Sequence, residues 1–96
     1  MSKITPGKKR YVKRQLATAQ PTVLIGKNGV TTELIKEIEK QLRKETMVKV
    51  KLLKTALAEG ETKHIATRIA QQTEAALVEV RGHTFMIYKP RSKLDT

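Results

Sequence analysis

The stretch TMVKVKLL, residues 46–53, alternates between two kinds of side chain. Val48, Val50 and Leu52 fall on one face of an extended chain, whereas Lys49 and Lys51 fall on the other. This alternation is typical of a β-strand with one buried face and one wetter, basic face. The chain should therefore contain a sheet that packs on one side and is not fully covered on the other.

The segments around this strand predict the remaining elements. Apolar side chains at helical spacing predict helices at about 8–19, 31–44 and 61–73. Short β-branched or alternating runs predict strands at 22–25, 75–80 and 83–88, the last two joined through Arg81-Gly82 as a β-hairpin. The predicted order is α-β-α-β-α-β-β. It indicates an α/β fold in which a βαβ crossover makes the first two strands parallel, giving a mixed four-stranded sheet packed with helices.

The length of the chain, 96 residues, suits a single domain with one modest core. We expect its ends, about 1–7 and 92–96, to be flexible. The sequence has no cysteine, which excludes disulfides and thiolate metal sites. No apolar run approaches the roughly 18 residues of a membrane span, and the start MSKITPGKKR lacks the apolar segment of a signal peptide. We therefore expect a cytoplasmic protein without a membrane partner.

Positive charge is concentrated in the first third of the chain. The net charge is +11, and no acid precedes Glu33, while seven Lys and Arg residues do. A one-signed segment of this kind is typical of a protein with a polyanionic partner. A solubility tail or the Lys-rich surface of a thermophile is the alternative.

The first predicted helix carries most of these cations. Val12, Leu16 and Ala19 share one face, Arg10 and Arg14 lie on the opposite face, and Lys13 lies on the flank. A surface of this kind suits the phosphates of a nucleic acid. The candidate phosphate contacts on this helix are Lys9, Arg10, Lys13 and Arg14.

A glycine-bracketed turn, Gly26-Lys27-Asn28-Gly29, joins the first strand to the second helix. Glycine allows a backbone to approach a ligand closely, and a helix N-terminus attracts anions. The turn lacks the nucleoside-triphosphate loop pattern and the dinucleotide fingerprint. It could be an ordinary turn, but its place after a strand and before a helix favours a phosphate contact. On this basis, replacing Gly29 with Asp should weaken binding while the fold is kept.

Catalytic and metal-binding patterns are not apparent. His64 and His83 are far apart and have no ligand spacing, and no Ser/His/Asp set is available. We therefore predict no enzymatic activity, no metal, no cofactor and no small-molecule substrate. The few aromatic residues, Tyr11, Phe85 and Tyr88, predict that contacts to a nucleic acid are made mainly to its backbone and shape.

Three segments together resemble a known family. The segments PTVLIGKNGVTTELIKEIEKQL, VKVKLL and ALVEVRGHTFMIYKPR are similar to the CRM domain, the chloroplast RNA splicing and ribosome maturation domain, and most of all to its small stand-alone prokaryotic members of the YhbY type. The resemblance spans about residues 8–91. The loop KTALAEGET, residues 54–62, is longer than the family pattern.

This resemblance implies a fold similar to the C-terminal domain of translation initiation factor three. It also implies RNA binding, with ribosomal RNA or precursors of the large ribosomal subunit as partners, and in plants a role in group II intron splicing. The conserved loop of the family falls on Gly26, Lys27, Asn28 and Gly29, and its basic first helix falls on Lys9, Arg10, Lys13 and Arg14. If that helix lies beside the turn, both should follow one RNA backbone. A DNA-binding chromatin protein of the Alba type is the alternative, because VLIGK also resembles its first strand and turn.

Overall fold

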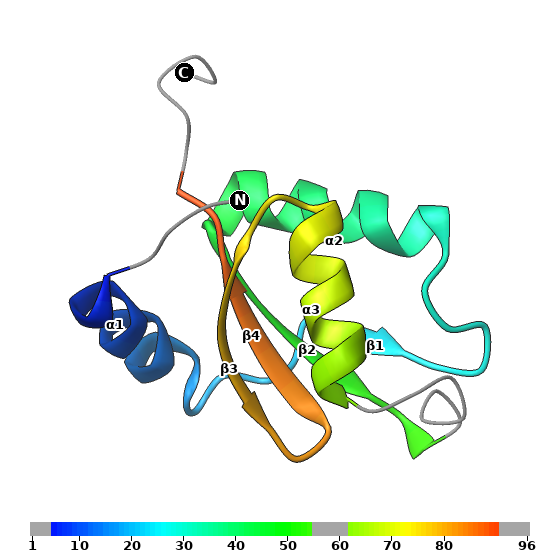
Figure 1. Cartoon of the computed structure of the whole chain (residues 1–96), viewed down its shortest axis with the longest axis horizontal. Coiled ribbons are helices and arrows are strands. Elements are labelled where there is room, and N and C mark those ends of the chain that lie inside the picture. Colours follow the sequence, from blue (N-terminus) through cyan, green and yellow to red (C-terminus); the bar gives the residue numbers. More distant parts are fainter. Residues whose placement is uncertain (1–4, 55–61, 91–96) are drawn as a thin grey trace.

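The computed structural model describes residues 5–54 and 62–90. Within these ranges the order of elements is the predicted one, α-β-α-β-α-β-β (Figure 1). The elements are α1 (Pro6–Leu16), β1 (Val23–Ile25), α2 (Thr32–Glu45), β2 (Met47–Leu52), α3 (Thr62–Gln72), β3 (Ala76–Arg81) and β4 (Thr84–Tyr88). None of the helices in the described ranges has the length and apolar character needed to cross a bilayer.

The four strands form one mixed sheet in the order β1-β2-β4-β3. β1 runs parallel to β2, and β4 runs antiparallel to both β2 and β3. The predicted βαβ crossover through α2 is confirmed, and so is the hairpin of β3 and β4. Gly82 and His83 connect the hairpin strands, and Gly82 has the positive φ of 57° that a tight two-residue connection requires at its first position.

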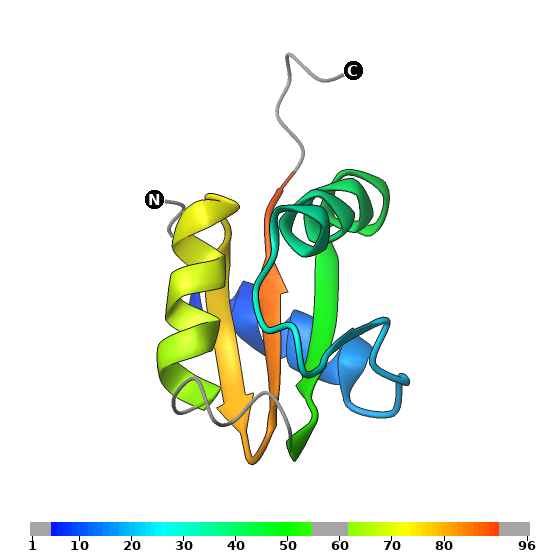
Figure 2. The same ribbon diagram turned by 90° about the vertical axis from the view of Figure 1, so that its right-hand side faces the viewer.

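The main core lies between the sheet and the two helices α2 and α3. Figure 2 shows both helices on the same side of the strands, with α1 on the other side. As the alternation predicted, Val48, Val50 and Leu52 are buried in this core, together with Phe85 of β4. Burial of these side chains is the main force that holds the sheet to its helices.

Hydrogen bonds at their ends fix the limits of the helices. The side chain of Thr31 accepts a hydrogen bond from the N–H of Leu34 at 3.1 Å and begins α2. α2 ends at the left-handed residue Thr46, whose N–H donates to the carbonyl of Leu42, and β2 begins at the next residue. α1 starts at Pro6 after the N-cap Thr5, so residues 5–7 form the start of a helix. The remainder of both predicted flexible ends, and most of the loop 54–62, lie outside the described residues.

α1 packs on the second face of the sheet through a small separate core. Val12 is fully buried against Val78 and Met86, and Leu16 packs beside them. The inward placement of Val12 and Leu16 was predicted, but the helix ends at Leu16 and not at Ala19. The ammonium group of Lys49 on β2 donates to the carbonyls of Leu16 and Ala19, at 2.9 and 3.0 Å, and so holds the segment that follows the helix.

An irregularity in β3 places one acidic side chain under α1. Leu77 pairs with Ile87 and Glu79 with Met86, so Val78 is an extra residue, as in a β-bulge. Val78 therefore packs in the small core under α1, and Glu79 lies on the same face of the sheet. The simple alternation that the sequence suggested for residues 75–80 does not hold at this point.

Candidate nucleic-acid interface

The Gly26–Gly29 segment is a tight β-turn. The N–H of Gly29 donates to the carbonyl of Gly26 at 2.9 Å, and the side chains of Lys27 and Asn28, between them, are exposed. Gly29 is buried and has a φ of 66°, in the left-handed region that favours glycine. The turn thus presents one cation and one amide to solvent, and its last position requires glycine for conformational reasons.

The turn is not continuous with the helix that follows it. Val30 and Thr31 separate Gly29 from α2, and the side chain of Thr31 already satisfies the N–H of Leu34. Glu33, in the first turn of α2, is exposed and adds a negative charge there. The N-terminus of α2 is therefore less favourable for an anion than the sequence suggested, and Lys27 is the principal positive group of this turn.

The basic side chains of α1 divide into two groups. Arg10 and Arg14 are exposed, on the side of the helix away from Val12, as predicted. Lys9 and Lys13 are half-buried. The ammonium group of Lys13 lies 3.5 Å from Glu79 Oε1, so this predicted phosphate contact has a partner within the protein.

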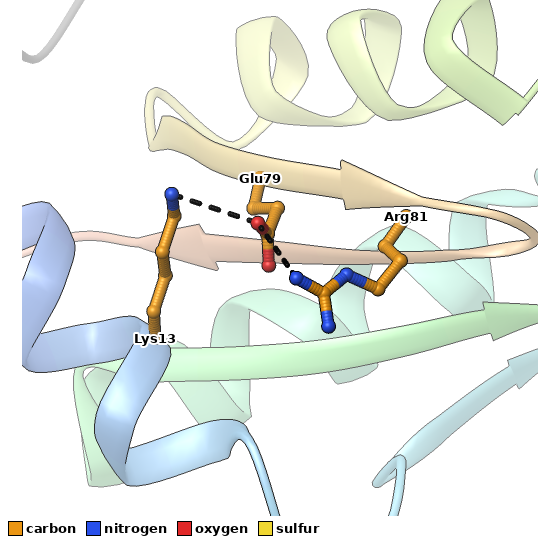
Figure 3. Close-up of polar contacts among 3 residues, drawn as sticks. All are labelled: Lys13, Glu79 and Arg81. Carbon is orange, nitrogen blue, oxygen red and sulfur yellow. Dashed lines mark ion pairs between the residues drawn. The ribbon is translucent and has the colours of Figure 1, made fainter.

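Glu79 holds a second cation as well. Figure 3 shows its carboxylate between Lys13 of α1 and Arg81 of β3, and the guanidinium group of Arg81 lies 3.7 Å from Oε1. The side chain of Arg81 is 84% exposed, whereas that of Glu79 is 20% exposed. Solvent screens such a pair strongly, so Arg81 remains available to an anionic ligand.

The part of the sheet that α1 leaves uncovered is also basic. The strand register places Leu24, Lys51, Thr84 and Arg81 in one row across all four strands. Lys51 and Arg81 are exposed in this row. The wetter face predicted for the second strand is thus confirmed at Lys51, whereas Lys49 is used by the protein to cap α1. We refer to Lys27, Lys51, Arg81, Lys13, Arg10 and Arg14 together as the basic strip.

The first helix and the turn are not side by side. In Figure 1 α1 lies at one end of the long axis and the turn between β1 and α2 at the other, and Figure 2 shows the turn in front of the sheet and α1 behind it. The cross-strand row that contains Lys51 and Arg81 lies on the face of the sheet that carries α1. A single polyanion that contacts both α1 and the turn must therefore reach both sides of the sheet.

Arg81 was missed as a site residue because the sequence identified it only as part of a hairpin connection. Its position opposite Thr84, in the same row as Lys51, follows from the register of three strands and from the bulge at Val78. The pair formed by Tyr11 of α1 and Tyr88 of β4 was also not identified as a site, because the two residues are far apart in sequence. Lys8 lies close to both rings.

The sequence also predicted that the protein binds no metal. In residues 5–54 and 62–90, no three His, Cys, Asp or Glu side chains come together as a metal site requires. His64 on α3 and His83 in the hairpin are both exposed. These two side chains therefore offer no enclosed position for a ligand.

Comparison with known proteins relates the chain to several others. It is 34% identical to the "Probable RNA-binding protein MJ0652" of Methanocaldococcus jannaschii over 93% of its own length, and it spans 66% of that longer relative. It is also 34% identical to the "RNA-binding protein" of Haemophilus influenzae, over 94% of this chain and 89% of the relative. The solution structure of the hypothetical protein SAV1595 of Staphylococcus aureus, for which RNA binding is suspected, matches with a TM-score of 0.75 and 27% identity, over 95% of this chain and 93% of that one.

These similarities favour the resemblance noted in the sequence and give no support to the Alba-type alternative. The matching segments include both α1 and the turn, so the candidate residues lie inside the region of similarity. The CRS1 / YhbY (CRM) domain model matches residues 4–89, which is nearly the whole chain. The chain therefore belongs to the CRS1/YhbY (CRM) domain family.

Proposed function

We propose that this protein binds structured RNA, mainly through the phosphate backbone, and that the basic strip is the surface that binds it. The observation that supports this proposal most directly is the row containing Lys51 and Arg81, which adds two exposed cations to those of α1 on the same face of the sheet. Family membership and the RNA-binding names of the relatives support RNA as the ligand.

Backbone contacts explain the composition of this strip. Lys and Arg neutralise phosphates whatever the sequence of the bases, and they position a protein on a nucleic acid. Lys51 and Arg81 have no aromatic neighbour in their row, which contains Leu24 and Thr84. The uncovered sheet thus differs from the aromatic sheet platforms of proteins that read bases there.

The cellular role that we propose is assembly of the large ribosomal subunit in the cytoplasm, with ribosomal RNA or pre-ribosomal particles as the partner and without catalysis. This part of the proposal rests on the CRM family resemblance. Cross-linking the protein to RNA in living cells and sequencing the bound RNA tests it. We expect enrichment of the large-subunit ribosomal RNA and its precursors. An even distribution over messenger RNAs would contradict an assembly role.

The salt dependence of binding tests the backbone mechanism. The basic strip together with Lys9 offers about five to seven phosphate contacts, so the logarithm of affinity should fall against the logarithm of salt concentration with a slope of about −3.5 to −6. Affinity for a folded RNA should be compared with that for a DNA duplex of the same sequence, and RNA should bind more tightly. A nearly salt-independent affinity would contradict the mechanism, and tighter binding to DNA would contradict the proposed ligand.

A further inference from the structure

A groove of about 600 Å³ lies beside α1, on the flank away from Lys13. Its walls come from α1, the C-terminal end of α2, the start of β2 and the end of β4. The volume is within the range of small-molecule sites in proteins. The residues that matter for its chemistry are Lys8, Tyr11, Gln15, Gln41, Glu45 and Tyr88.

Both tyrosines of the chain line this groove, which also contains a cation placed between them. The ammonium group of Lys8 lies 5.2 Å from the centre of the Tyr11 ring and 5.5 Å from that of Tyr88. Tyr88 packs against the small core under α1, whereas Tyr11 is 49% exposed. An exposed ring with a cation beside it suits stacking with a planar, electron-rich group.

The charged side chains around the groove include an acid as well as two lysines. Lys49 also lines the groove, but its ammonium group donates hydrogen bonds to the carbonyls of Leu16 and Ala19. Glu45 is exposed at the rim and opposes the charge of Lys8. The two lysines and the one glutamate that line the groove therefore sum to a formal charge of +1, which is smaller than the charge of the basic strip on the other flank of the helix.

Amide side chains supply hydrogen bonds at the same place. Gln41 donates through Nε2 to Glu37 and to the carbonyl of Thr22, so its oxygen remains an acceptor. The exposed side chain of Gln15 makes no hydrogen bond to any residue in the described part of the chain. An amide offers both a donor and an acceptor, which the polar edge of a nucleobase requires.

We propose that this groove holds an unpaired nucleobase of the bound RNA, stacked on Tyr11, with Lys8 at the adjoining phosphate. This inference rests on the proposed function and adds a base-binding position to it. At 3.6 residues per turn, Arg10 and Arg14 lie between the Lys13 flank and the Tyr11 flank of α1. An RNA strand that follows the basic strip over the outer face of the helix therefore reaches the groove. The protein would select RNA in which a structured part adjoins an unpaired segment.

The emission of the two tyrosines is a direct probe, because the chain has no tryptophan and both tyrosines line the groove. Three RNAs are compared: a blunt hairpin, the same hairpin with a four-nucleotide single-stranded overhang, and a hairpin whose overhang has the same phosphates but lacks bases. We expect quenching of tyrosine emission and the tightest binding only with the base-bearing overhang. Equal quenching and equal affinity for all three RNAs would overturn the proposal, although the blunt hairpin would still bind through the basic strip. Failure of all three to bind would overturn the proposed function as well.

A pair of variants separates stacking from other effects. Tyr11→Ala should lower affinity for the base-bearing RNA roughly fivefold to 150-fold, the range given by loss of one stacked base. It should leave the affinity for the blunt and the base-free RNAs unchanged. Tyr11→Phe keeps the ring and should retain the affinity for all three. An unchanged affinity of Tyr11→Ala for the base-bearing RNA would exclude the groove as a base site. A protein would then be the remaining kind of partner for this groove.

Discussion

The carboxylate of Glu79 on β3 lies 3.5 Å from the ammonium group of Lys13 on α1, and the same oxygen lies 3.7 Å from Arg81. One acidic side chain thus contacts two cations of the basic strip and offsets one of their two positive charges. A phosphate that binds to either cation must compete with Glu79. In the proposed binding mode the carboxylate lowers the affinity for RNA, and its ion pair with Lys13 links α1 to the sheet.

Replacing this acid should strengthen RNA binding. Glu79→Gln keeps the size of the side chain and removes its charge, so a phosphate at Lys13 or Arg81 no longer competes with a carboxylate. We expect affinity to rise roughly twofold to fivefold at low salt, in line with the small free energy of exposed ion pairs. Fluorescence anisotropy with a labelled RNA hairpin checks this. An affinity equal to that of the unmodified protein would place Lys13 and Arg81 outside the binding surface.

Two neighbouring lysines on β2 should behave differently. Lys49 donates to the carbonyls of Leu16 and Ala19, whereas Lys51 is exposed in the cross-strand row. Lys49→Met should reduce the free energy of unfolding by about 2 kcal/mol, because the end of α1 loses charged hydrogen bonds. Lys51→Met should change it by less than about 0.5 kcal/mol. Urea denaturation of both variants measures this difference.

The same pair tests the binding surface. Lys51→Met should make the slope of log affinity against log salt shallower by about 0.7 to 0.9, since one phosphate contact is lost. Its sequence preference should not change, because the contact is to the backbone. A variant with a normal slope would show that RNA does not cross the uncovered half of the sheet.

The turn needs variants that separate conformation from charge. Gly29 is buried at a φ of 66°, so Gly29→Asp adds strain as well as charge, and the expectation that it keeps the fold is not supported. Gly29→Ala should cost about 1–2 kcal/mol of stability through the left-handed backbone alone. Lys27→Ala, at an exposed position, should leave stability unchanged and make the salt slope shallower by about one unit. If Lys27→Ala binds every RNA normally, the turn is an ordinary connection.

Charge reversal on α1 should affect binding far more than stability. Arg10→Glu with Arg14→Glu changes two exposed side chains, so the free energy of unfolding should stay within about 0.5 kcal/mol. The loss of two phosphate contacts should make the salt slope shallower by roughly 1.4 to 1.8. Lys36→Glu with Lys40→Glu is the matched control, because these residues are exposed at the same spacing on α2, which covers the other face. Equal losses in both double variants would indicate a general effect of net charge.

The sequence predicted those features that depend on local periodicity. The alternation of residues 46–53 correctly placed Val48 and Val50 inside and Lys51 outside, and the helical spacing around Val12 correctly identified the exposed face of α1. These features follow from one element at a time, because a strand or a helix fixes which of its own side chains share a face.

Features that depend on two elements could not be predicted in this way. The role of Lys49 depends on where α1 ends above β2, and the position of Arg81 depends on the bulge at Val78. The distance in space between α1 and the turn arises because α1 packs on one face of the sheet and α2 on the other. Short sequence separation, across Pro21 and β1, suggested that the two lie together, but the strand carries the chain away from α1.

The small core under α1 has a consequence for the motions of the molecule. Its buried members are Val12, Val78 and Met86, whereas fourteen buried residues join the sheet to α2 and α3. Elements with few buried contacts open locally at a lower free energy than the rest of a domain. Amide hydrogens of α1 should therefore exchange with solvent faster than those of β2 and β4. An RNA strand that contacts both α1 and the far turn would slow this exchange, making the helix open and close with the domain as one cooperative unit.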